Sequence, residues 1–320
     1  MSKPVLFSSF RPLSRSENLS AIYHAYPGDK VHILSYAPNY KNEVLSGKYD
    51  LMVTDDFPSC TPGKCIVIWH GIQGGKRIGL DQPGHPYFSE ETAKMITYII
   101  SAGTGTIDIW HQCTGVQKDH ILPLGMPRTD EYAGYRPENH DKTMYLYVPT
   151  FRDKGETPFP AIDWAYIDSQ LTDDEMLVIK AHPWQADVGI DQVTNEIDSG
   201  MYKHIGVIPS GSPTSPWLYI ADVVITDYSS IMFDAFLLDK PVVLFEKNHG
   251  YTETRGMYFD YPYDYCSFIA IDEIELLASI RYRTKHPYLT GAEHRIRDIT
   301  SDMCDGHACE RLCNLIEGLR

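Results

Sequence analysis

The sequence lacks the features that mark several large classes of protein. None of its 320 residues belongs to an apolar run approaching the ~18 residues that cross a bilayer. The start, Met1 to Val5, has no basic segment followed by an apolar one, so we expect no secretion signal. Hydrophobic residues make up 43% and charged residues 22%, which excludes a disordered or collagen-like chain.

Positive charge is also scarce. The chain has 28 Lys and Arg against 43 Asp and Glu, a formal net charge of −15. Nucleic acids and anionic lipid surfaces are bound by basic faces. We therefore expect no nucleic-acid partner and at most peripheral contact with a membrane. A small anionic ligand held by a few local donors stays compatible with this charge.

The cysteines suggest neither a disulfide framework nor a metal centre. There are seven of them, an odd number without regular spacing, which favours reduced thiols in the cytoplasm. Cys304, Cys309 and Cys313, with His307 between them, could form a metal cluster. Cys309 and Cys313 lie four residues apart, however, and fit better on the apolar face of a terminal helix. We assign no metal and no cofactor.

Two phosphate-binding motifs are missing as well. No GxxxxGK[ST] loop occurs, and no GxGxxG opens the first helix. ATP hydrolysis and ordinary dinucleotide binding therefore lose support.

What is present is an alternation of short apolar runs with helical patterns, typical of parallel sheets covered by helices. Helices are expected over Glu17–Tyr26 and Ser89–Ile96. The expected strands are Val5–Phe7, Val31–Leu34, Leu51–Val53, Cys65–Trp69, Tyr98–Ile100, Ile121–Leu124, Met144–Val148, Met176–Ile179, Ala221–Ile225 and Pro241–Phe245.

This pattern predicts an α/β protein of two doubly wound, Rossmann-like domains facing a cleft. The polar stretch Tyr135–Lys142 is the expected linker, which gives domains over residues 1–137 and 138–320. A last helix is expected after Asp305, with Asp305 as its N-cap. Its apolar face, which includes Leu312 and Ile316, is expected to pack in or near the interdomain region.

In the first half, the candidate site residues follow a strand end, where open α/β sheets bind ligands. His70 ends a buried strand, and Gly71 next to it permits close backbone approach. This histidine is either a general base acting on a hydroxyl or a structural residue with a satisfied hydrogen bond. The following Gln73–Arg77 loop, with Lys76 and Arg77, either meets a phosphate or is a solvated turn.

The second half has similar strand ends. His182 precedes a proline, and it is either functional or a capping histidine. A strand is joined to an apolar helix by Thr226-Asp227-Tyr228-Ser229-Ser230. The hydroxyls and backbone N–H groups at the start of this helix are suited to bind an anion. The alternative is plain N-capping of the helix by Ser229 or Ser230. Arg152 and Arg255 either hold a diphosphate or form surface ion pairs.

With these residues in place, the chain resembles the CDP-glycerol glycerophosphotransferase family, the teichoic-acid primases and polymerases with a GT-B fold. The segment Ala221–Pro241 is highly characteristic. The other matching segments, in family order, are Trp69-His70-Gly71, Gly125–Asp130, Val148–Arg152, His182-Pro183, Arg255–Asp260 and Asp305-Gly306 with Glu310-Arg311.

The resemblance implies transfer of glycerol phosphate from CDP-glycerol to a hydroxyl acceptor, lipid-linked or polymeric, with release of CMP. It implies His70 as the base, His182 as a second essential histidine, and donor binding by Ser229 and Ser230. Arg152, Thr226, Asp227 and Arg255 join the donor side. Gly71, Lys76, Arg77 and Arg128 are assigned to the acceptor side, in a protein of the cytoplasm or the inner face of the plasma membrane.

One departure concerns the acceptor. The family has Thr, Pro and Leu after its His-Gly pair, whereas this chain has Ile72-Gln73-Gly74. The alternatives are a CDP-ribitol or other CDP-polyol phosphotransferase, and a GT-B glycosyltransferase or epimerase using a sugar nucleotide. A non-catalytic nucleotide-binding protein is a further class, against which the two strand-end histidines argue.

Overall fold

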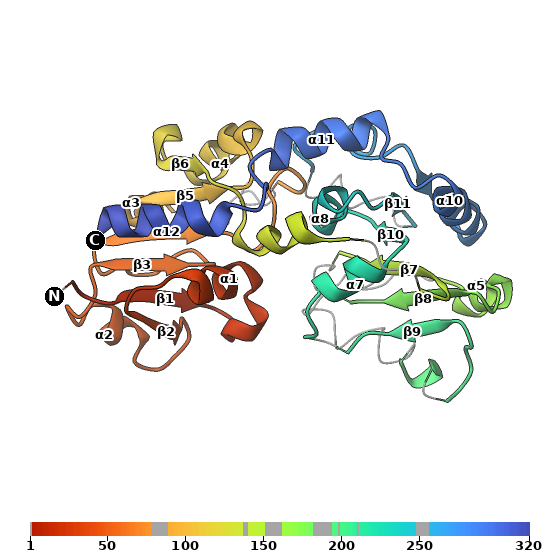
Figure 1. Ribbon diagram of the computed structural model, residues 1–320, viewed down its shortest axis with the longest axis horizontal. Helices are drawn as coiled ribbons and strands as arrows, with labels where there is room; N and C mark the ends of the chain where they lie inside the picture. The colour runs from red at the N-terminus through yellow and green to blue at the C-terminus, as the bar shows by residue number, and fades with distance from the viewer. Residues whose placement is uncertain are drawn as a thin grey trace. The chain divides into compact units, whose positions relative to one another are not determined.

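The protein forms two compact α/β units, drawn in Figure 1 from a computed structural model. One unit contains Met1–Gly134 and Arg297–Arg320, and the other contains Tyr135–Ile296. The structure describes residues 2–77, 89–136, 140–150, 162–181, 194–197, 199–209, 211–247 and 256–320. The predicted site residues His182, Arg152 and Arg255 lie outside these ranges.

The first unit has a six-stranded parallel sheet in the order β2-β1-β3-β4-β5-β6. The strands are β1 Val5–Ser9, β2 Lys30–Leu34, β3 Leu51–Thr54, β4 Lys64–Ile68, β5 Tyr98–Ser101 and β6 Ile121–Pro123. The helices are α1 Glu17–Ala25, α2 Tyr40–Val44, α3 Glu90–Met95, α4 Ile107–Thr114 and α12 Ala308–Leu319, with 3-10 turns at Leu13–Arg15, Thr104–Thr106, Lys118–His120 and Pro127–Gly134.

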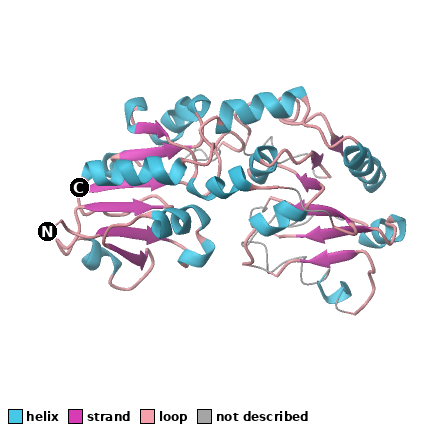
Figure 2. Ribbon diagram, viewed as in Figure 1, coloured by secondary structure: helices cyan, strands magenta, loops and turns pink. Residues whose placement is uncertain are grey.

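Helices cover both faces of this sheet, as the magenta strands and cyan helices of Figure 2 show. One face packs Leu6, Met52 and Val67 against Trp110 of α4. The other packs Phe7 and Val53 among residues of α1 and α12. Burial on both faces explains why these strands read as continuous apolar runs.

The second unit has another six-stranded parallel sheet, in the order β12-β11-β10-β7-β8-β9. Its strands are β7 Thr143–Val148, β8 Glu175–Ile179, β9 Ile205–Val207, β10 Val223–Thr226, β11 Val242–Phe245 and β12 Ile269–Ala270. Its helices are α5 Trp164–Gln170, α7 Ser215–Ile220, α8 Ile231–Leu237 and α10 Glu273–Lys285; α11, Gly291–Ser301, contains the division between the units.

The predicted strands are all present, with ends shifted by at most two residues. Strands β9 and β12 have no counterpart in the prediction, since Ile205–Val207 and Ile269–Ala270 are too short to show a pattern.

The last helix differs from the prediction in its grouping. Residues 297–320 cluster with the first unit, whereas the sequence assigned them to the second domain. The reason is the apolar face of α12: Leu312 and Ile316 are fully buried in the core beside Leu19 and Ile22 of α1. Cys309 and Cys313 pack against the same cluster, which confirms their predicted place on the apolar face.

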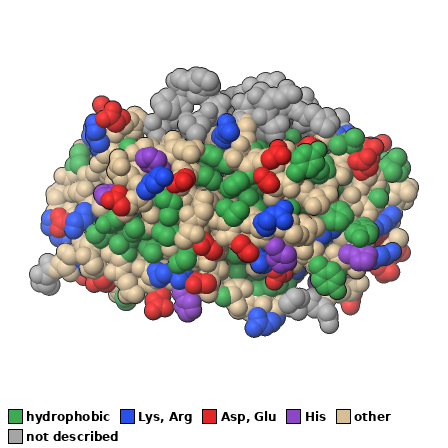
Figure 3. Space-filling model, turned by 90° about the horizontal axis from the view of Figure 1, so that it is seen from above, with side chains coloured by type: hydrophobic (Ala, Val, Ile, Leu, Met, Phe, Trp, Pro, Cys, Tyr) green, Lys and Arg blue, Asp and Glu red, His purple; other side chains and the backbone are tan. Residues whose placement is uncertain are grey.

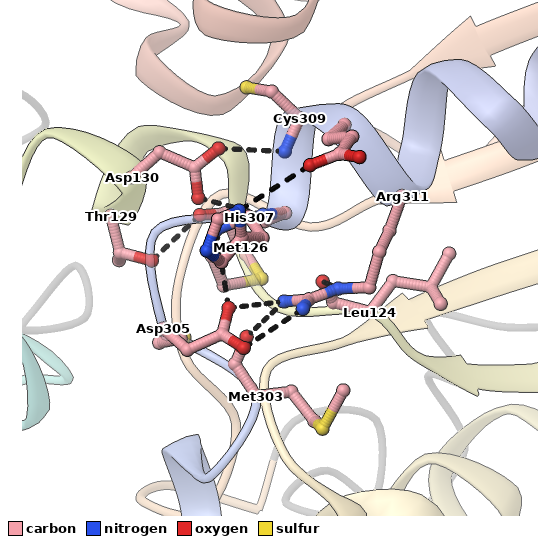
Figure 4. A network of polar contacts seen from close by, with 12 residues as sticks. Leu124, Met126, Thr129, Asp130, Met303, Asp305, His307, Cys309 and Arg311 are labelled. Carbon is pink, nitrogen blue, oxygen red and sulfur yellow. Dashed lines mark hydrogen bonds and ion pairs between the residues drawn. The ribbon is translucent and has the colours of Figure 1, made fainter. Parts of the chain in front are cut away.

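The start of α12 also corrects a prediction. The residue at the N-cap is His307, and no side chain of its own segment caps the helix. Asp130 does so instead: its carboxylate oxygens accept hydrogen bonds from the N–H groups of Ala308 at 2.8 Å and Cys309 at 2.7 Å (Figure 4). Asp305 instead accepts bonds from Arg311 at 2.7 and 3.0 Å.

Two glycines permit this junction. Gly125 has φ +85°, and a Cβ there would lie 2.2 Å from the carbonyl oxygen of Met303. Gly306 has φ +91°, and a Cβ there would lie 2.7 Å from Ala133 Cβ. The segments Gly125–Asp130 and Asp305–Arg311, which carry part of the family resemblance, are therefore in contact and hold the start of α12 against its unit.

Candidate active site

Both sheets have a topological switch point, where open α/β sheets bind ligands outside the carboxyl ends of the strands. In the first unit the strand order reverses between β1 and β3. In the second unit it reverses between β7 and β10. We therefore built the candidate site from the residues that follow these strands and β4 beside them.

His70 follows β4, and its ring packs against the ring of Trp69. The imidazole lies 4.1 Å from the ring of Trp69, centroid to centroid, with 36° between the planes. Trp69 is buried and its ring lies 4.9 Å from that of Phe57. His70 itself is exposed. The arrangement thus offers an accessible imidazole with a defined orientation.

The backbone beneath His70 is fixed by two buried polar side chains. Asn18 Nδ2 donates to the Trp69 carbonyl at 2.9 Å, and Arg128 Nη1 donates to the His70 carbonyl at 2.8 Å. The backbone N–H of Arg128 in turn donates to Asn18 Oδ1 at 3.0 Å. Arg128 therefore holds the His70 loop in place, and its predicted contact with the acceptor stays a prediction.

Sequence reasoning missed Asn18. It is 2% exposed inside α1, so only its polar character among the apolar residues of that helix would have marked it.

The loop after His70 is packed rather than solvated up to Gly75. Gly71 to Gly75 are buried, Lys76 is half-buried and Arg77 is exposed. The solvated-turn interpretation is therefore wrong for Gln73–Gly75, while the basic end of the loop does reach the surface. Whether Gly71, Lys76 and Arg77 meet the acceptor stays a prediction.

At the switch point of the second unit, Thr226 and Asp227 at the end of β10 form hydrogen bonds with the chain at the end of β7. Thr226 Oγ1 donates to the Val148 carbonyl at 2.6 Å. Asp227 Oδ1 accepts hydrogen bonds from the N–H groups of Thr150 at 2.7 Å and Tyr228 at 2.6 Å. Asp227 is 1% exposed, so its carboxylate shapes the loops rather than facing solvent.

The serine pair begins α8. Ile231 N donates to Ser229 Oγ at 3.5 Å, a weak cap, and Ser230, at the N-cap, makes no side-chain cap bond. Capping by Ser230 is therefore wrong as an explanation of that hydroxyl. Both serines are half-buried at the carboxyl edge of β10, where their donor-binding role stays a prediction.

Charges and possible metal ligands give no competing site in the described part of the chain. On the face shown in Figure 3, Lys and Arg side chains are interspersed with Asp and Glu rather than gathered in one patch. Within the described ranges, no cluster of three or more His, Cys, Asp or Glu side chains could hold a metal ion. No helix among these residues is long and apolar enough to cross a membrane.

With this geometry established, the comparison with known families is decisive. The profile of the family described as CDP-Glycerol:Poly(glycerophosphate) glycerophosphotransferase matches residues 49–318. The chain belongs to this family. The match extends over both units and includes the His70 loop and the Thr226–Ser230 segment, as the resemblance predicted.

Curated relatives of the family are teichoic-acid enzymes. The poly(ribitol-phosphate) polymerase of Bacillus spizizenii is 27% identical over 244 residues, covering 66% of this chain and 38% of the relative. The glycerol-phosphate primase of Bacillus subtilis is 25% identical over 277 residues, covering 80% of this chain and 68% of the relative. Against the two Bacillus spizizenii relatives, the chain spans 38% and 54% of their lengths.

Solved structures confirm the GT-B fold class. The wall teichoic acid polymerase TagF matches with a TM-score of 0.77 at 21% identity, over 99% of this chain and 88% of that one. The UDP-GlcNAc 2-epimerase of Neisseria meningitidis, bound to UDP-GlcNAc, matches with a TM-score of 0.63 at 10% identity, over 99% and 100% of the two chains.

Proposed function

We propose that this chain transfers glycerol phosphate from CDP-glycerol to a hydroxyl acceptor and releases CMP. The observation that carries the proposal is the family match over residues 49–318, which contains the candidate residues of both units. A TagF structure obtained with a CDPG soak has the same fold, in support of the donor class. The family match favours this activity over the epimerase or glycosyltransferase alternative, because the shared fold alone does not distinguish them.

CDP-ribitol is the second candidate donor. A ribitol-phosphate polymerase from Bacillus spizizenii is among the relatives, at 27% identity. Both donors contain the same CDP diphosphate, so residues that contact the polyol must determine which donor is used.

The reaction requires a proton to leave the acceptor hydroxyl as its oxygen attacks the phosphorus that bears glycerol. The new P–O bond forms as the bond to the CMP oxygen breaks, and CMP leaves with the bonding electrons. Phosphoryl transfer of this kind depends mostly on positioning and charge neutralisation. His70 takes the proton: its exposed imidazole is oriented by Trp69, and its backbone is held by Arg128.

The donor is assigned to the second unit and the acceptor to the first. The switch point between β7 and β10 supports the first assignment, because Thr226 ends β10 and Asp227 and the two serines follow it. Arg152, His182 and Arg255 belong to the donor side by their family motifs. In the first unit, Gly71, Lys76, Arg77 and Arg128 border the His70 loop, which supports acceptor binding there.

The acceptor is a hydroxyl compound that is lipid-linked or polymeric, as the teichoic-acid relatives suggest. We place the reaction in the cytoplasm, free or peripheral at the inner face of the plasma membrane. None of the seven cysteines forms a disulfide, which supports a reducing compartment.

The test is release of nucleotide from a panel of CDP-glycerol, CDP-ribitol, UDP-sugars and GDP-sugars, with a glycerol-phosphate-primed acceptor. CMP formed from CDP-glycerol with extension of the acceptor supports the proposal. CMP formed from CDP-ribitol alone supports the second candidate, and release of UDP or GDP alone overturns both.

The role of His70 is tested by His70→Ala under single-turnover conditions. General-base catalysis is worth about 10²–10⁴ in rate, so we expect that loss with donor affinity unchanged. The matched control is His120→Ala, which removes an exposed histidine of the same unit. A near-normal single-turnover rate in His70→Ala excludes His70 as the base.

A further inference from the structure

Asp55 lies at the topological switch point of the first unit. It directly follows β3, and the last residue of β3, Thr54, pairs with Ser8 of β1 and with Val67 of β4. The parallel register therefore places Asp55 beside Ile68, two residues before His70. Ligands bind open α/β sheets at this position, outside the carboxyl ends of the strands that flank the reversal.

The carboxyl of Asp55 is buried without its full set of hydrogen bonds. The residue is 8% exposed, and Oδ1 has no partner. Its neighbour Asp56 differs, because Asp56 Oδ1 accepts a hydrogen bond from the N–H of Phe57 at 2.8 Å. The Asp55 carboxyl receives a hydrogen bond from the Ser16 side chain. A buried, unpaired carboxyl oxygen opposes folding, so stability does not explain why Oδ1 is left without a partner.

A second unsatisfied buried group lies in the loop that follows β4. Gln73 is 4% exposed in the loop after β4, and its Nε2 has no hydrogen-bond partner. Adjacent strands β3 and β4 are thus followed by a free acceptor and a free donor. A hydroxyl group both donates and accepts, and so matches this pair, whereas a phosphate only accepts and is repelled by a carboxylate.

We propose that Asp55 is an acceptor-binding residue, whose Oδ1 accepts a hydrogen bond from a hydroxyl of a polyol acceptor. Gln73 Nε2 donates to a hydroxyl oxygen of the same polyol. The inference rests on the proposed function and assigns polyol hydroxyl recognition to this edge of the first unit.

The test compares Asp55→Leu and Asp55→Asn with the matched control Asp56→Asn, which keeps an oxygen for Phe57 N–H. A lost hydrogen bond to a charged group corresponds to roughly 10- to 100-fold in KM for the acceptor. We expect that increase in Asp55→Leu and a smaller one in Asp55→Asn, which keeps a carbonyl oxygen. The KM for CDP-glycerol should stay unchanged, and the melting temperature of Asp55→Leu should rise.

Lower acceptor affinity together with higher stability is the distinguishing result. Replacing a purely structural residue would instead lower both the acceptor affinity and the stability. An unchanged acceptor KM in both Asp55 variants overturns the inference, as does an equal increase in Asp56→Asn. Should Asp55→Leu fail to fold, the stability argument fails with it, and Asp55→Asn alone then decides on acceptor binding. Absence of CDP-glycerol binding by the unmodified chain would be the failure of the proposed function instead.

Discussion

Asp130 and Cys309 are 179 residues apart in sequence, yet the Asp130 carboxylate accepts the Cys309 N–H at 2.7 Å and closes the N-terminus of α12. Sequence reasoning assigned this cap to Asp305. Asp305 accepts the N–H of His307 at 3.2 Å and two hydrogen bonds from Arg311, whereas the N–H groups of Ala308 and Cys309 inside the helix donate to Asp130. A long-range cap of this kind leaves no periodic signal in the sequence.

The first prediction concerns this cap. Asp130→Ala removes the acceptor of two helix N–H groups and a negative charge at the helix N-terminus. We expect the free energy of unfolding to fall by about 1–2 kcal/mol. Urea denaturation measures it, with Asp119→Ala, an exposed aspartate of the same unit, as the control. Equal stability of the two variants would show that α12 needs no cap from Asp130.

The second prediction concerns Asn18, which both donates and accepts. Asn18→Asp keeps the acceptor for the Arg128 N–H but loses the donor to the Trp69 carbonyl. Leaving that buried carbonyl unpaired costs about 1–3 kcal/mol. We therefore expect reduced stability and a lower turnover rate, because the His70 loop loses one of its supports.

The control is Asn39→Asp, which alters an exposed asparagine of the same unit. Thermal unfolding and acceptor-dependent CMP release are measured on both variants. Full activity in Asn18→Asp would show that the Trp69 carbonyl contact does not orient His70.

The sequence predicted most of the fold because both sheets are buried on two faces. Val5–Ser9 and Val242–Phe245 are buried throughout, and their segments Val5–Phe7 and Val242–Phe245 form the apolar runs that predicted these strands. The sequence also predicted the positions of His70 and Thr226–Ser230 at strand ends, which the structure confirms, while their chemical roles stay predictions. Asn18 and Asp55 were not singled out, since their surroundings depend on which strand ends and carbonyls lie beside them, and sheet order sets those neighbours.

The third prediction concerns the serine pair. Replacing Ser229 and Ser230 by Ala removes two hydroxyls of which only one, on Ser229, accepts a helix N–H, at 3.5 Å. We expect at most a small change in melting temperature and a clear loss of CDP-glycerol affinity. Calorimetric titration measures the affinity, and Ser215→Ala, at the start of α7 in the same unit, is the control. Unchanged donor affinity in the folded double variant would remove the serines from the donor site.

The last prediction follows from the titration of Asp55. Burial raises its pKa from 3.8 to about 6; Asp56 adds to the increase, while Ser16 and Arg11 oppose it. The folded state therefore binds the proton more tightly than the unfolded state, so stability falls as pH rises from about 4 to about 6. A shift of about two pKa units corresponds to about 2–3 kcal/mol.

Asp55→Asn abolishes this titration, so its stability relative to the unmodified protein should increase by that amount between pH 4 and 6 and stay level above pH 6.5. Urea denaturation of both proteins across this pH range measures the difference. Because the comparison cancels the carboxylates common to both, a difference that does not change with pH would mean that Asp55 titrates in the folded chain as it does in the unfolded one.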